Sequence, residues 1–211
     1  MSSGWKTYEV DGRRLDVLHQ KSSDGCGLAC VAMVVNRCDG SHPTERAVMH
    51  VVNSPGYRGY AHEAKQGRYI PADRDRPAKD RGTDFSYTGT HAVGLADYLR
   101  QYGIASKYHL FPSKSDDFGD FIEQYYNPCF PMILKVYVNN RQPHFIVLEG
   151  FQKLDRGAGV NFIISDPGIW PAGGAWLAKL NVNRGEQGVI IRERPSLNYF
   201  VGEGVECSWQ G

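Results

Sequence analysis

The chain has 211 residues, 41% of them hydrophobic, and a formal net charge of +1. This composition suits one folded domain over residues 1–211 and excludes global disorder, while the balanced charge gives no electrostatic basis for binding nucleic acid or an anionic membrane. Five cysteines are too few for a disulfide scaffold, and neither a signal-peptide pattern nor an apolar run of roughly 20 residues is present. We therefore expect reduced thiols in a soluble protein that is cytoplasmic or delivered by a dedicated secretion system.

The first half of the chain predicts a hairpin followed by helices. Apolar residues alternate on either side of Asp11 and Gly12, which predicts a β-hairpin over residues 5–20 with a two-residue turn. The segment from Cys26 to Asn36 is apolar on nearly all sides, so we expect a central, buried helix. Further helices are predicted over residues 44–52, 89–104 and 116–126.

Residues 54–88 interrupt this helical half with glycines, tyrosines and a run of mixed charges. A loop of this length within a compact domain indicates either a solvated insertion or a functional segment. Because tyrosine and arginine are favoured at interfaces, our working hypothesis is a mobile lid or a surface that contacts the substrate.

The second half of the chain predicts strands. Three segments rich in β-branched and aromatic residues, separated by turn residues, predict an antiparallel meander over residues 131–138, 143–151 and 160–166. Segments 188–192 and 199–201 would complete the sheet, with residues 168–174 as a loop between strands. Helices followed by strands give an α+β fold class.

The segment from Gln20 to Cys26 carries the strongest chemical signal. Asp24 or Gly25 can cap the following helix, so Cys26 falls at the helix N-terminus, where unpaired backbone N–H groups and the helix dipole favour a thiolate. Gln20 precedes Cys26 closely enough for its amide to lie beside the sulfur and bind a developing oxyanion. Such an arrangement suits acyl transfer by a thiol nucleophile.

Two further residues complete a candidate catalytic triad. His144 begins the second strand of the meander and Asp166 ends the third. Because the start of one antiparallel strand lies beside the end of the next, we expect the imidazole and the carboxylate at the same edge of the sheet. His144 would take the Cys26 proton, and Asp166 would orient the imidazole ring.

With these residues in place, the chain resembles the papain-like cysteine peptidases, and most closely peptidase family C39 and its relatives. The segments that carry the resemblance are Gln20 to Cys30, the helix that follows, residues 89–104, Pro143 to Gly150, and Asp166-Pro167. The resemblance implies a papain-like fold, with a helical lobe around a central helix and an antiparallel β lobe. It also implies catalysis by Cys26, His144, Asp166 and Gln20, a peptide or protein substrate, and no metal or organic cofactor.

Other activities use the same four residues. The segment after Cys26 is also similar to phytochelatin synthase, a papain-fold transpeptidase, so transpeptidation and deamidation of amide side chains stand beside hydrolysis as alternatives. Such a motif is also found on secreted bacterial toxins and effectors, for which a neutralising or immunity protein would be the expected partner.

A different class of function is a zinc-stabilised binding module. The spacing of Cys26, Cys30, Cys38 and His42 supplies four side chains of the kinds that bind zinc. This hypothesis leaves Gln20, His144 and Asp166 without a role, and we rank it below the peptidase hypothesis. Under the peptidase hypothesis, Cys30 is expected to pack in the core, and Cys38, Cys129 and Cys207 are expected to be structural.

Overall fold

The structure is a computed structural model, and the ranges that it describes are 4–21, 25–52, 92–110, 124–138, 142–153, 160–169, 173–181, 189–191 and 198–210. The predicted insertion over residues 54–88 lies outside these ranges, as does most of the helix predicted over residues 116–126. In the described part of the chain, no helix has both the length and the hydropathy to cross a membrane.

The chain begins with the predicted hairpin. Strands β1 (Trp5–Val10) and β2 (Arg13–Leu18) pair antiparallel and form a sheet of their own. Both turn residues have positive φ, 49° at Asp11 and 70° at Gly12, as a two-residue turn between twisted strands requires. The hairpin prediction is therefore confirmed, and β2 leads directly toward Gln20.

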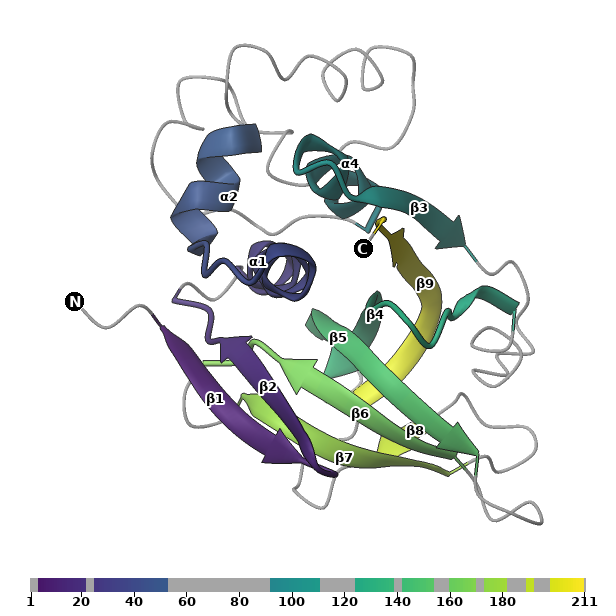
Figure 1. The fold of residues 1–211 in the computed structure, drawn as a ribbon. Coiled ribbons are helices and arrows are strands. Elements are labelled where there is room, and N and C mark those ends of the chain that lie inside the picture. Colours follow the sequence, from purple (N-terminus) through teal and green to yellow (C-terminus); the bar gives the residue numbers. More distant parts are fainter. Residues whose placement is uncertain are drawn as a thin grey trace.

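Helix α1 (Cys26–Asp39) is the centre of the molecule. Figure 1 shows it between α2 (Glu45–Val52) and α4 (Ala92–Gln101) on one side and the strands on the other. Every residue of its first three turns is buried, which confirms the prediction of a central helix. The helix ends at Gly40, whose φ of 72° and backbone N–H bond to the Asn36 carbonyl form a left-handed C-cap.

The main sheet is antiparallel and closes on itself. The predicted meander is present as the order β4, β5, β6, and the chain continues through β7 and β8 to β9. Strand β9 pairs with both β8 and β4, so β4 to β9 form a ring, while β3 pairs with the far half of β9. The bounds are β3 (Ala105–Leu110), β4 (Met132–Val138), β5 (Gln142–Lys153), β6 (Val160–Asp166), β7 (Gly174–Asn181), β8 (Val189–Ile191) and β9 (Asn198–Ser208).

The two faces of the ring bury different cores. Successive residues of a strand point to opposite faces, so Phe145 and Val147 pack in the cluster that surrounds α1, while Ile146 and Leu148 pack in a second cluster inside the ring. The order of a helical half followed by an antiparallel sheet confirms the α+β class.

Two strands were not predicted from the sequence, and a third is much longer than expected. Strand β7 follows a segment predicted as a loop and contains residues of low β-propensity, yet its residues 174–180 pair with β6. Strand β3 places the polar side chain of His109 in a buried position, against Glu206 of β9. Strand β9 was expected only around residues 199–201 because its glycines and glutamates mask a strand pattern.

Candidate active site

The predicted contact between the imidazole and the carboxylate is present. Nε2 of His144 lies 2.8 Å from Oδ1 of Asp166, and both side chains are largely buried. The β5–β6 register, which pairs Val147 with Ser165, places the start of β5 beside the end of β6. The backbone N–H of Gly168 donates to the same carboxylate oxygen at 2.7 Å and fixes its position. With Nε2 held by Asp166, the other ring nitrogen is the one left to act as a base.

The segment around Gln20 is bound to the residues that follow Asp166. The backbone N–H of Gln20 donates to the carbonyl of Pro167 at 2.7 Å. Next to it, Nδ1 of His19 donates to the carbonyl of Gly168 at 2.8 Å, because a carbonyl oxygen can only accept. The two elements that carry the proposed oxyanion donor and the proposed orienting carboxylate are thus joined directly.

His19 is held from its other side as well. Its Nε2 lies 2.7 Å from the hydroxyl of Tyr8, on the first strand of the hairpin. Since Nδ1 donates to the Gly168 carbonyl, Nε2 is the ring nitrogen placed to accept a hydrogen bond from the Tyr8 hydroxyl. Sequence reasoning missed both residues, because a histidine beside an apolar strand has no local pattern that reveals its partners.

Cys26 is the first residue of α1, as predicted. The N-cap is Gly25, whose carbonyl accepts the N–H of Ala29, and the helix has no acidic residue in its first turn. The thiol is 8% exposed and packs in the same core cluster as Phe145, the residue after His144. In the described residues, no hydrogen bond joins the Cys26 sulfur to His144. The structure therefore brings the Gln20 backbone, His144 and Asp166 together and leaves the thiol–imidazole contact open.

Cys30, the second cysteine of α1, is too deeply buried to act as a nucleophile. Cys30 is fully buried, and burial raises the pKa of its thiol well above the ordinary value, with Cys26 and Glu149 adding to the effect. A thiol in this environment stays protonated and packs as a small apolar side chain. This agrees with the prediction that Cys30 belongs to the core.

A buried carboxyl, Glu45, stands next to the Gln20 segment and was also missed. Its Oε1 accepts the backbone N–H of Lys21 at 2.6 Å, so it holds the residue that directly follows Gln20. Burial raises the pKa of Glu45 from 4.5 to about 7, while the bond from Lys21 works in the opposite direction.

The zinc-module hypothesis is wrong. Cys26 and Cys38 lie in one continuous helix, which separates them by about 18 Å along its axis, whereas zinc ligands lie about 2.3 Å from the metal. His42 contacts Asp16 at 3.3 Å and the Trp5 ring instead. Nowhere in the described ranges do three side chains of metal-binding type come together.

Comparisons with known proteins add little. No protein-family model matches this chain, and no curated protein matches it. Among solved structures, it is similar to a double glycine motif protease from an AMS/PCAT transporter, crystallised in complex with the leader peptide. The identity is 18% and the TM-score 0.40, over 98% of this chain and 94% of that one. A likeness this distant decides neither the fold family nor the activity.

Proposed function

We propose that this chain is a papain-like cysteine peptidase in which Cys26 is the nucleophile. His144 is the general base and acid, Asp166 orients it, and Gln20 stabilises the oxyanion. One observation carries the proposal: the 2.8 Å bond between His144 and Asp166 lies next to the Pro167 carbonyl that anchors Gln20, six residues before Cys26. A structural histidine alone would not explain why the residue directly after the orienting carboxylate, Pro167, is bound to the glutamine segment.

The reaction uses each group in turn. His144 takes the proton of the Cys26 thiol, and the thiolate attacks the carbonyl carbon of the scissile peptide bond. The amide of Gln20 and the backbone N–H of Cys26 bind the oxyanion that forms. His144 then gives its proton to the leaving amine as the C–N bond breaks, which leaves a thioester on Cys26. Water, deprotonated by His144, hydrolyses the thioester and restores the thiol.

The open thiol–imidazole contact agrees with this mechanism. Catalytic hydrogen bonds are often long in the absence of substrate and tighten when the substrate binds. Transfer of the acyl group to an amine, or attack on a glutamine side chain, would proceed through the same thioester. Hydrolysis, transpeptidation and deamidation therefore differ only in the acceptor and the amide attacked. We extend the proposal to a peptide or protein substrate, and to a neutralising partner if the chain acts as a toxin or effector.

The test measures the reactivity of Cys26 with a thiol alkylator at pH 6, followed by intact mass. Cys129 is exposed and Cys38 half-buried, so both are first replaced by alanine to remove their background labelling. We expect one rapid modification that is lost in Cys26→Ala and slowed at least tenfold in His144→Ala, since the imidazole promotes thiolate formation.

A control variant separates this effect from a general loss of structure. His109→Ala removes another buried histidine, one that contacts Glu206 far along the chain from the site. It should leave the labelling rate of Cys26 within about twofold. Slow labelling that is insensitive to His144 would refute the proposal.

A further inference from the structure

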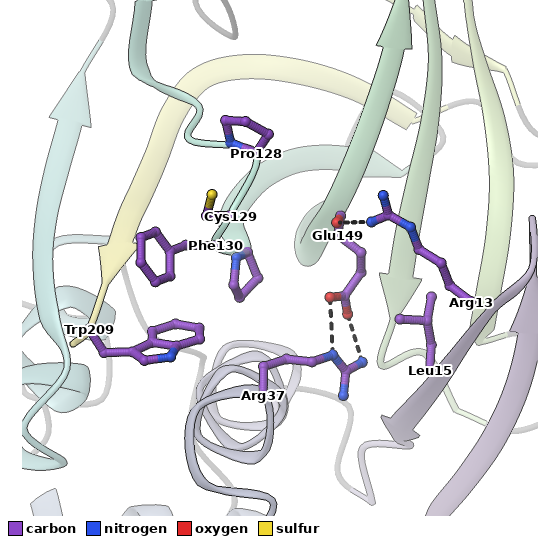
Figure 2. A pocket seen from close by; sticks show the side chains of 9 residues that line it. Arg13, Leu15, Arg37, Pro128, Cys129, Phe130, Glu149 and Trp209 are labelled. Atoms are coloured by element: carbon purple, nitrogen blue, oxygen red, sulfur yellow. Dashed lines mark hydrogen bonds and ion pairs between the residues drawn. The ribbon is translucent and has the colours of Figure 1, made fainter. Parts of the chain in front are cut away.

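A pocket of about 240 Å³ opens at the C-terminal end of α1. Since Arg37 follows Cys26 by three helical turns, about 16 Å along the axis, the pocket is separate from the candidate active site. Figure 2 shows arginine and glutamate side chains on one side of it and aromatic rings on the other. Its lining consists of Arg13, Leu15, Arg37, Pro128, Cys129, Phe130, Pro131, Glu149 and Trp209.

The positive charge of Arg37 is neutralised by the Glu149 carboxylate, which lines the same pocket. Its Nε and Nη2 donate to the two carboxylate oxygens of Glu149 at 3.1 and 2.8 Å, and Ser165 donates its hydroxyl to the same carboxylate at 2.7 Å. Arg37 also donates to the carbonyl of Asp16 and to the side chain of Asn36. This arginine is therefore part of a structural network and has little capacity left for a ligand.

Arg13 is different, because no carboxylate in the described ranges pairs with it. Its Nη1 donates to the backbone carbonyl of Glu149 at 3.1 Å, and that acceptor is neutral. The guanidinium lies against Gly150, where a Cβ atom would come within 2.8 Å of Nη1. The glycine thus leaves room for the Arg13 guanidinium beside the β5 backbone, and among the described residues no carboxylate contacts that positive charge.

The opposite wall of the pocket is apolar and rigid. The rings of Phe130 and Trp209 pack edge to face with their centroids 4.7 Å apart, and the prolines on either side of Cys129 and Phe130 restrict the backbone. The volume is below the roughly 300 Å³ at which sites for drug-sized ligands begin. The space therefore suits one side chain and its attached charged group, with the rest of the molecule in solvent.

We propose that this pocket binds the C-terminal residue of a peptide, with its carboxylate on Arg13 and an apolar or aromatic side chain against Phe130 and Trp209. A planar carboxylate matches the forked donors of a guanidinium, and an aromatic side chain would complete the edge-to-face ring packing. The proposal uses none of the candidate catalytic residues, so it stands or falls independently of the peptidase proposal.

The experiment titrates the full chain with N-acetylphenylalanine and, separately, with N-acetylphenylalanine amide, which differs only in lacking the charge. Calorimetry or NMR should give an affinity for the acid at least tenfold higher than for the amide. Arg13→Gln should reduce acid binding at least tenfold, whereas Arg14→Gln, its exposed neighbour on β2, should change it less than twofold. Equal affinity for acid and amide, or equal effects of the two substitutions, would overturn the proposal.

Two further measurements place the ligand in the pocket. Cys129 is exposed and lines the pocket, so saturating acid should slow its alkylation several-fold while that of Cys38 stays unchanged. Gly150→Ala should weaken acid binding although it removes no charge, because the added methyl group displaces the Arg13 guanidinium. If acid binding leaves the labelling of Cys129 unaltered, the ligand lies elsewhere and the proposal fails.

Discussion

Glu45 is a buried titratable residue in direct contact with the segment that carries Gln20. It is 5% exposed and accepts the backbone N–H of Lys21, between Gln20 and Cys26. Its folded-state pKa of about 7 lies above the 4.5 of an ordinary glutamate. Between these two values the folded chain holds a proton that the unfolded chain has lost. The free energy of unfolding contributed by this group therefore falls as pH rises through this window, and stays constant above it.

The corresponding prediction concerns Glu45→Gln, which keeps an acceptor for Lys21 and removes the titration. Relative to this variant, the natural chain should lose about 3 kcal/mol of unfolding free energy between pH 4.5 and pH 7. Urea denaturation at pH 5 and pH 8 measures the difference. Glu9→Gln, at an exposed position on β1, should show no such pH dependence. Parallel pH curves for the natural chain and Glu45→Gln would contradict the assignment.

A second prediction at this scale concerns Asp166. Asp166→Ala removes the acceptor of His144 and of the Gly168 N–H, and should slow Cys26 alkylation at pH 6 at least tenfold. Asp166→Asn keeps a side-chain oxygen that can accept from either donor, so it should slow the alkylation of Cys26 less than Asp166→Ala does. An alanine variant that labels as fast as the natural chain would exclude a role for Asp166 in orienting the imidazole.

Among single residues, the sequence predicted those contacts that follow from the order and pairing of neighbouring strands. The contact between His144 and Asp166 was predictable because the register of consecutive antiparallel strands brings them together. The catalytic roles of these residues, of Cys26 and of Gln20 stay predictions. Glu45 could not have been found in this way, since its burial depends on the packing of α2 against a loop that is distant in sequence.

Among the elements, α1 is tied to the sheet by a buried ion pair. Arg37 at the end of the helix binds Glu149 of β5 through two hydrogen bonds, and Arg37 also reaches the backbone of β2 at Asp16. The carboxylate side chain is 4% exposed, so removing either partner leaves a charge with poor access to water.

We predict that Glu149→Gln lowers the free energy of unfolding by about 3–5 kcal/mol, because the Arg37 charge then stays buried without its partner. Urea denaturation at pH 7 provides the measurement. The matched control is Asp97→Asn, which breaks the more exposed pair of Asp97 with Arg100 on α4 and should cost less than about 1 kcal/mol. Equal losses in the two variants would show that the Glu149 pair is no more than a surface contact.

The elements themselves were predictable where hydrophobic periodicity was strong. The hairpin, α1 and the meander of β4 to β6 follow from turn residues and apolar runs in the sequence. Strands β3 and β7 could not be found this way, since their residues show weak alternation and their pairing depends on partners outside their own segment. Tertiary hydrogen bonding therefore overrides local propensity at both positions.

At the scale of the whole molecule, β9 closes the ring and joins it to the helical half. One strand pairs with β3, β4 and β8, and its buried residue Val205 packs in the cluster around α1. No sequence pattern within β9 signals this closure, because ring closure is a property of strands that are far apart along the chain. The prediction of a sheet completed by a short final strand was accordingly incomplete.

This topology predicts the pattern of amide hydrogen exchange. Residues 204–207 of β9 should exchange only through global unfolding, since separating β9 opens the ring and the core together. The β1–β2 hairpin belongs to a separate sheet and should open at a lower free energy. The measurement is native-state exchange in increasing denaturant. Exchange of residues 204–207 at lower free energy than the hairpin would rule out a closing role for β9.

The short corner of Asp166, Pro167 and Gly168 has one more consequence. A single bend in the chain orients the imidazole on one side and carries the glutamine segment on the other. Gly173 lies so close to Gly168 that no side chain fits between them, which leaves the bend little freedom to adjust. If the proposed roles hold, the group that accepts the proton and the segment that binds the oxyanion would keep a constant spacing, because one tightly packed bend connects them.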